Sequence, residues 1–279
     1  MPKTNANGIN IYYEIHGSGE PLVLINGLGY DLWMWHKMVS FLAKHFQVIT
    51  FDNRGIGQTD QPKGLYSAEM LADDLAGLLE ELGVPQAAVM GHSMGGFIAQ
   101  AFALKYPAKV SKLILSATNF GGPNHLPITQ EALAILMDIR GDPAERLRRG
   151  IRVSCAPGFS EKEADFVEEW IHYRLTHPLQ PEPYQAQLAI GLSLMTEAAS
   201  FEKKLQAVHA PTLILFGEHD KVVPTGNAAL LAKAILDSRT KFIPNAGHFF
   251  PLETPEQAAQ ILIHFLEPEI TVIGGAYSE

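Results

Sequence analysis

The feature that most constrains the fold is a serine framed by glycines in the first half of the chain. Residues 91–95 read Gly-His-Ser-Met-Gly, and they join an apolar run to a segment with helical spacing. This G-x-S-x-G pattern is typical of a nucleophile elbow, a tight turn between a strand and a helix. Such a turn brings strand and helix so close that Gly91 and Gly95 can carry no side chain. A pattern of five residues can also occur by chance, so this assignment needs support from the rest of the chain.

Two backbone N–H groups are candidates for binding an oxygen that becomes negative. Met94 follows Ser93 at the start of the predicted helix, where N–H groups are free and the helix dipole favours negative charge. Residues 26–30, Asn-Gly-Leu-Gly-Tyr, follow the apolar run at 21–25, and the N–H of Leu28 is expected to face the same oxygen. An ordinary turn between a strand and a helix is the alternative for this loop.

Composition and charge narrow the class of protein. A chain of 279 residues with 47% hydrophobic residues can bury a large core. The net charge of −9 and the lack of a Lys/Arg-rich run argue against nucleic acid or a membrane as partner. The single cysteine, Cys155, fits a reducing compartment, and no apolar leader or 18-residue apolar run occurs. We expect a cytoplasmic protein that acts on a small molecule; its oligomeric state stays open.

The order of apolar runs predicts an α/β fold. Strand-like runs alternate with helical patterns and indicate a mostly parallel central sheet flanked by helices. They lie at residues 21–25, 46–52, 88–90, 110–116, 211–217 and 241–244, and residues 9–15 alternate like an edge strand. From 120 to 208 the pattern is helical and interrupted by prolines. The sequence therefore predicts an α/β core of residues 1–119 and 209–279 with a helical cap inserted at 120–208.

Two further side chains are predicted to meet Ser93. Asp220 follows the strand at 211–217, and His248 lies on the loop after the last short strand. Because the carboxyl ends of parallel strands share one edge of a sheet, the three side chains are expected to lie together. An imidazole can take the proton of a serine hydroxyl, and a carboxylate fixes the imidazole's tautomer. Ser93, Asp220 and His248 are therefore the candidate catalytic residues.

Neighbouring residues compete for these roles. Glu218 is the rival of Asp220, but the strand at 110–116 ends without a carboxylate, which favours the loop after 211–217. His92 is expected to point away from Ser93, and His219 to face the other side of the chain. A zinc site from Glu218, His219 and Asp220 fits only in residue type, because neighbours in sequence do not easily converge on one ion.

Other polar segments are assigned to structure rather than chemistry. The glycines at 55 and 57 lack the dinucleotide-binding spacing, and Arg54 is expected to be an ion-pair partner. We therefore expect no metal and no cofactor. The basic cluster at 146–152 and the residues around Arg174 are interpreted as solvated helix surfaces.

The motifs together resemble the α/β-hydrolase superfamily from about Gly8 to Leu266. The resemblance rests on residues 91–96, 52–57, 217–220 and 246–249, in the chain order nucleophile, acid, base. Residues 26–35, Asn-Gly-Leu-Gly-Tyr-Asp-Leu-Trp-Met-Trp, depart from the His-Gly loop of many members and are similar to the 3-oxoadipate enol-lactonases. The resemblance implies a small ester or lactone substrate.

The expected activity is that of a serine hydrolase. Carboxylic ester or lactone bonds of small, largely apolar substrates would be cleaved through an acyl-enzyme on Ser93, with the N–H groups of Leu28 and Met94 as the oxyanion hole. Three alternatives stay open at this point: hydrolysis of carbon–carbon bonds, perhydrolysis with the same three residues, and a regulator that binds a ligand without turnover.

Overall fold

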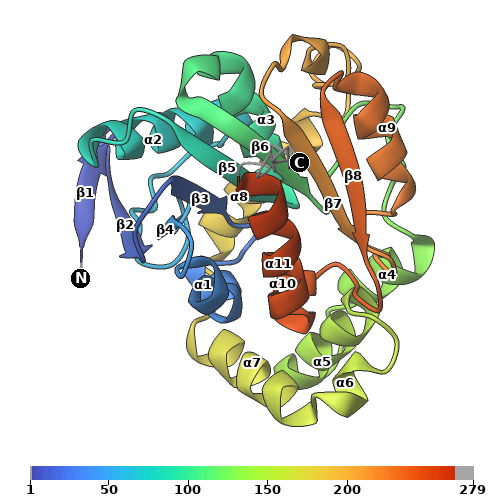
Figure 1. The fold of residues 1–279 in the computed structure, drawn as a ribbon. Coiled ribbons are helices and arrows are strands. Elements are labelled where there is room, and N and C mark those ends of the chain that lie inside the picture. The colour runs from blue at the N-terminus through green and yellow to red at the C-terminus, as the bar shows by residue number, and fades with distance from the viewer. Residues whose placement is uncertain (1, 268–279) are drawn as a thin grey trace, which may run out of the picture.

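The computed structural model describes residues 2–267 and is organised around one eight-stranded sheet (Figure 1). The strand order is β1-β2-β4-β3-β5-β6-β7-β8. The strands are β1 (Lys3–Ala6), β2 (Ile9–His16), β3 (Pro21–Ile25), β4 (Gln47–Phe51), β5 (Ala87–His92), β6 (Val110–Ser116), β7 (Thr212–Gly217) and β8 (Ser238–Ile243). β2 pairs antiparallel with both β1 and β4, and the remaining pairs are parallel. The predicted mostly parallel sheet is confirmed.

The outer strands differ from the sequence prediction. β2 was expected at the edge of the sheet, but β1 pairs along its outer side, with Lys3 opposite Tyr12. β1 has the polar sequence Lys-Thr-Asn-Ala, so hydrophobic periodicity gives no sign of it. At the other edge, β8 begins at Ser238 rather than at 241, because an edge strand can keep exposed polar residues.

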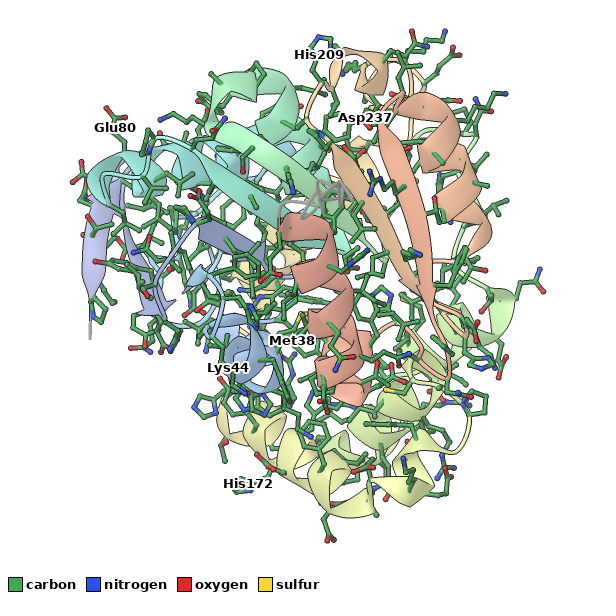
Figure 2. All side chains as sticks on the ribbon, in the orientation of Figure 1. Met38, Lys44, Glu80, His172, His209 and Asp237 are labelled. Carbon is green, nitrogen blue, oxygen red and sulfur yellow. The ribbon has the colours of Figure 1, made fainter. Side chains whose placement is uncertain are left out.

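Helices cover both faces of the sheet. α2 (Ala68–Glu81), α3 (Met94–Lys105) and α9 (Gly226–Ala234) pack on one face, and α1 (His36–Leu42), α10 (Phe250–Glu253) and α11 (Pro255–Leu266) on the other (Figure 1). Strand side chains alternate between the two cores: Val23 faces the first, and Leu22 and Leu24 face the second. Figure 2 shows the side chains that fill these layers; Met38 of α1 is fully buried, whereas Glu80 and His209 lie at the periphery.

Five α-helices and one short 3-10 helix, Leu205–Ala207, separate β6 from β7 along the chain. The α-helices are α4 (Gln130–Leu136), α5 (Pro143–Ser154), α6 (Phe159–Lys162), α7 (Ala164–Thr176) and α8 (Pro181–Ser193). α5, α6 and α7 gather at one end of the molecule, at the bottom of Figure 1. They share an apolar cluster around Phe166 and Trp170 that continues to Leu252 of α10. No helix within residues 2–267 is long and apolar enough to cross a membrane.

The predicted turn between β5 and α3 is confirmed. β5 ends at His92, α3 begins at Met94, and Ser93 between them has φ 55° and ψ −118°. A Cβ atom on Gly91 would lie 2.2 Å from the carbonyl oxygen of Gly95, and one on Gly95 would lie 2.4 Å from that of Ile25. Both glycines are therefore required by the close approach of backbone to backbone, as the motif predicts.

This packing predicts a large loss of stability in Gly91→Ala. The added methyl group meets backbone, which cannot rotate away, so the free energy of unfolding should fall by at least about 2 kcal/mol. Gly150→Ala is the matched control, because its Cβ would meet only the Leu136 side chain at 3.4 Å. An alanine inside α5 should raise stability by about 0.5–1 kcal/mol. Urea unfolding measures both; equal stability of the two variants would contradict the proposed packing.

Candidate active site

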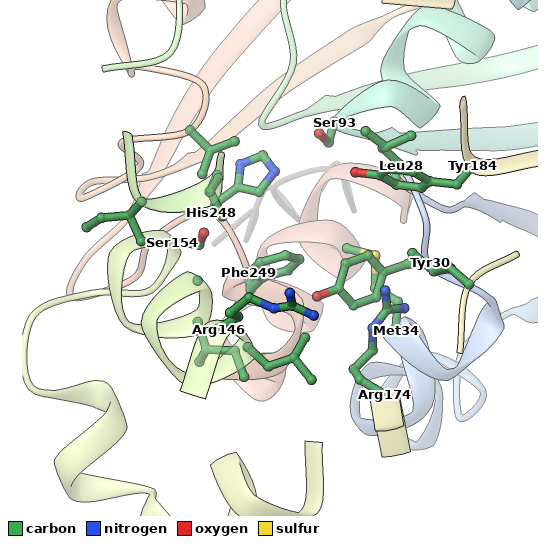
Figure 3. Close-up of a pocket in the computed structure, with 18 of the residues that line it drawn as sticks. Leu28, Tyr30, Met34, Ser93, Arg146, Ser154, Arg174, Tyr184, His248 and Phe249 are labelled. Carbon is green, nitrogen blue, oxygen red and sulfur yellow. The ribbon is translucent and has the colours of Figure 1, made fainter. Parts of the chain in front are cut away.

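Ser93 opens onto a cavity of about 510 Å³ at the carboxyl ends of the strands (Figure 3). The walls come from the loop after β3, the turn before α3, the helices α4, α5 and α7, and the loop that contains His248. Apolar side chains dominate these walls, among them Leu28, Met34, Ile135, Leu147, Ile151, Leu175 and Phe249. The serine hydroxyl therefore lies in a mostly apolar recess rather than on an open surface.

His248 and Asp220 form a buried pair beside Ser93. The His248 Nδ1 atom lies 2.8 Å from Asp220 Oδ2. The other carboxylate oxygen of Asp220 accepts the N–H groups of Val222 and Val223 at 2.9 and 2.8 Å. His248 lines the same cavity as Ser93, and Figure 3 shows its imidazole on the side toward which the serine hydroxyl points. The structure thus brings together the three side chains that the sequence singled out.

The rival residues lie elsewhere or are already engaged. Glu218 and His219 are exposed, whereas Asp220 is buried. His92, which was expected to point away from Ser93, is buried among the residues that line the cavity, and its ring lies 5.0 Å from the His248 ring between centroids. Its Nδ1 atom is hydrogen-bonded to Ser116 Oγ at 2.8 Å, and burial lowers the pKa of His92 well below its ordinary value. His92 is thus a neutral, packed imidazole.

Metal-binding geometry is missing from the part of the chain that the structure describes. Within residues 2–267, no three His, Cys, Asp or Glu side chains are grouped so that they could hold an ion. The consecutive residues Glu218, His219 and Asp220 diverge, with the first two facing solvent. Arg54 forms the expected ion pair, at 2.6 Å from Asp74.

The N–H groups of Leu28 and Met94 are both available beside Ser93. Across residues 2–267, neither donates a hydrogen bond to a protein acceptor. The loop that carries Leu28 is fixed on both sides, because Asn26 Nδ2 donates to the Phe51 carbonyl oxygen at 2.7 Å and Leu32 N–H donates to Asp52 at 2.9 Å. Free N–H groups on a rigid loop can bind an oxygen that gains charge.

Glu253 joins the His248 loop to the end of α5, a role that the sequence analysis missed. Its carboxylate accepts the Ala156 N–H at 2.7 Å and the Gly247 N–H at 3.0 Å. The His248 N–H donates to the Ser154 carbonyl oxygen at 2.6 Å. The position of the imidazole is therefore coupled to the helix that forms one wall of the cavity. Burial raises the pKa of Glu253 to about 7.

Two arginines expected on solvated helix surfaces also line the cavity, the first of them exposed and the second half-buried. They are Arg146 of α5 and Arg174 of α7. On α5, the cavity is lined by residues at positions 143, 146, 147, 150, 151 and 154, a helical stripe that includes Arg146. Arg148 and Arg152 lie off this stripe and pair with glutamates, as a solvated surface predicts.

The raised pKa of Glu253 predicts how Glu253→Gln changes stability with pH. Since the folded chain keeps this carboxyl protonated up to about pH 7, against an ordinary value of 4.5, wild-type stability falls as pH rises between those values. A glutamine stays neutral, and its oxygen can accept both N–H groups. Between pH 4.5 and 8, the free energy of unfolding of the variant should therefore rise by on the order of 3 kcal/mol relative to that of wild type, as measured by urea unfolding. If the two free energies of unfolding differ by the same amount at every pH, Glu253 does not have the raised pKa on which this prediction depends.

Comparisons with known proteins agree with the fold. The family model described as alpha/beta hydrolase fold matches residues 20–255. A Mycobacterium tuberculosis protein, whose name assigns it provisionally to the non-heme bromoperoxidases, is 32% identical over 267 residues, 92% of this chain and 97% of the relative. A thermophilic esterase from Thermogutta terrifontis superposes with a TM-score of 0.76 at 30% identity, covering 95% of this chain and 97% of the other.

An enol-lactonase is also among the similar solved structures. The enzyme from Burkholderia xenovorans has a TM-score of 0.78 at 26% identity and covers 95% of this chain and 99% of its own. These relatives carry out different reactions, so they support the superfamily and leave the substrate open. The family match spans β3 to the start of α11 and includes the strained serine turn and the His248–Asp220 pair. The chain belongs to the alpha/beta hydrolase fold family.

Proposed function

We propose that this protein hydrolyses carboxylic esters or lactones of small molecules through an acyl-enzyme on Ser93. The observation that carries the proposal is the buried His248–Asp220 pair, whose histidine lines the same cavity as a serine held at positive φ. A serine hydroxyl is a weak nucleophile at neutral pH and needs a base within reach. His248 supplies the base, and Asp220 holds its Nδ1–H so that Nε2 is free to take the proton.

The proposed reaction has two halves. The Ser93 oxygen attacks the ester carbonyl while His248 takes the hydroxyl proton, and the same imidazole then donates this proton to the departing alcohol oxygen. Water next attacks the acyl-enzyme with His248 as base, releasing the acid and restoring the serine. For a lactone, the alcohol and the acid are two ends of one product.

The oxyanion formed in both halves would be bound by the N–H groups of Leu28 and Met94. Support comes from their lack of protein acceptors within residues 2–267 and from the position of Met94 at the first turn of α3. One donor of this kind contributes roughly 3–4 kcal/mol of transition-state stabilisation in enzymes where it has been removed. The reaction requires no metal or cofactor.

We assign substrate selection to residues 120–208 as a cap over a core of residues 1–119 and 209–279. Side chains of α4, α5 and α7 line one side of the cavity and are mostly apolar, which suits a small acyl chain. The enol-lactonase and the esterase among the similar structures support the ester and lactone classes.

The proposal predicts that Ser93→Ala lowers kcat/KM for p-nitrophenyl butyrate by at least about 10³-fold. The loss should come without unfolding, because alanine removes only the hydroxyl. Ser40→Ala is the matched control, since that hydroxyl lies on α1 and donates to the Lys37 carbonyl oxygen. Full activity of Ser93→Ala would contradict the proposal. A panel with a lactone, a dienone and an ester plus hydrogen peroxide then separates hydrolysis of esters from carbon–carbon cleavage and perhydrolysis.

A further inference from the structure

Two cations face the cavity of Ser93 without an acidic partner. Arg174 donates from Nη1 to the Gly29 carbonyl oxygen at 2.6 Å, and its guanidinium lies 4.5 Å from the centre of the Tyr30 ring. Arg146 donates from Nη1 to the Ile139 carbonyl oxygen at 2.7 Å. Among the described residues, neither guanidinium lies within ion-pair distance of a carboxylate. Each therefore keeps donors free for another acceptor.

This lack of partners sets the two apart in an acidic chain. With 30 acidic against 21 basic residues, carboxylates are plentiful, and five other arginines pair with them. Those five are Arg54, Arg140, Arg148, Arg149 and Arg152. Of the residues between 2 and 267 that line the cavity, Asp138 alone carries a carboxylate, and Arg140 already binds it at 2.7 Å. The cavity thus keeps an excess of positive charge.

The two guanidinium groups are directed into one part of the cavity. Figure 3 shows Arg146 and Arg174 across the cavity from Ser93, with the Tyr30 hydroxyl between them. Burial raises the pKa of Tyr30 to about 12, so its hydroxyl stays a neutral hydrogen-bond donor. Three donors around one space, among mostly apolar walls, match the oxygens of a carboxylate.

We propose that Arg146 and Arg174, with Tyr30, bind a carboxylate of the substrate while Ser93 attacks its ester or lactone carbonyl at the other end. The inference rests on the proposed function and narrows its substrate to esters or lactones that carry a second, ionised carboxyl group. The apolar walls favour the part of the substrate that connects its two polar ends, and the two guanidinium charges fix the direction in which it binds. Such anchoring orients the carbonyl toward the serine.

Matched substrates test the inference directly. The monomethyl ester of adipic acid carries a free carboxylate, and the dimethyl ester is its neutral counterpart. Wild type should have a kcat/KM ratio of monoester to diester well above one, falling as salt is added, because the recognition is electrostatic. Arg146→Gln and Arg174→Gln should each lower this ratio about 10- to 100-fold, since each removes a charge-assisted contact. Arg146→Lys and Arg174→Lys should recover part of it.

Arg152→Gln is the matched control on the same helix. Arg152 is exposed, pairs with Glu161 and does not line the cavity, so the ratio should stay that of wild type. If wild type and the two glutamine variants hydrolyse both esters with the same kcat/KM ratio of monoester to diester, the carboxylate site is overturned. The proposed function would then stand.

A binding measurement separates the two proposals when hydrolysis is slow. Hexanoate is titrated into wild type and the cavity variants by calorimetry, with hexanamide, its neutral counterpart, and butyl phosphate as comparisons. We expect hexanoate to bind wild type at least tenfold more tightly than hexanamide and the variants to lose this advantage. Equal binding of hexanoate and hexanamide to wild type, or tighter binding of the phosphate, would overturn the inference, whatever the ester hydrolysis shows.

Discussion

The site depends on a close approach of two backbones. β5 and α3 meet at the elbow with no room for a Cβ atom on Gly91 or Gly95, and the backbone of Ser93 takes a positive φ in consequence. This conformation costs free energy for a residue with a side chain and persists only where the surroundings enforce it. Here the enforcement is the packing of α3 across the middle of the sheet, so the serine is positioned by the core of the molecule.

Buried carboxyl groups fix the loops around that serine through backbone N–H groups. Asp220 accepts the N–H groups of Val222 and Val223 as well as the imidazole of His248. Asp52 holds the loop with Leu28, and Glu253 holds the loop with His248; burial raises the pKa of each to about 7. These loops are thereby tied to rigid elements, and the proposed chemistry requires such fixed positions of its acid, base and oxyanion donors.

The sequence predicts the parts of this arrangement that local patterns determine. The glycine-framed serine and the chain order of Asp220 and His248 depend on turn chemistry and parallel-strand topology, and the structure has them as expected. β1 was missed because its polar residues pair through backbone alone. That Arg146 lines the cavity was missed because a run of four arginines on one exposed helix surface hides which member borders it; that is decided by how α5 packs. Glu253 acts through contacts with residues distant in sequence, which no local pattern encodes.

Site-specific labelling tests the proposed role of Ser93 most directly. A fluorophosphonate probe reacts with a serine whose hydroxyl is activated by a neighbouring base, and peptide mapping by mass spectrometry locates the adduct. The proposed mechanism predicts one adduct, on Ser93, formed by the folded protein, lost on unfolding and strongly slowed in His248→Ala. An adduct on another residue, or labelling of Ser93 at the same rate in that variant, would contradict it.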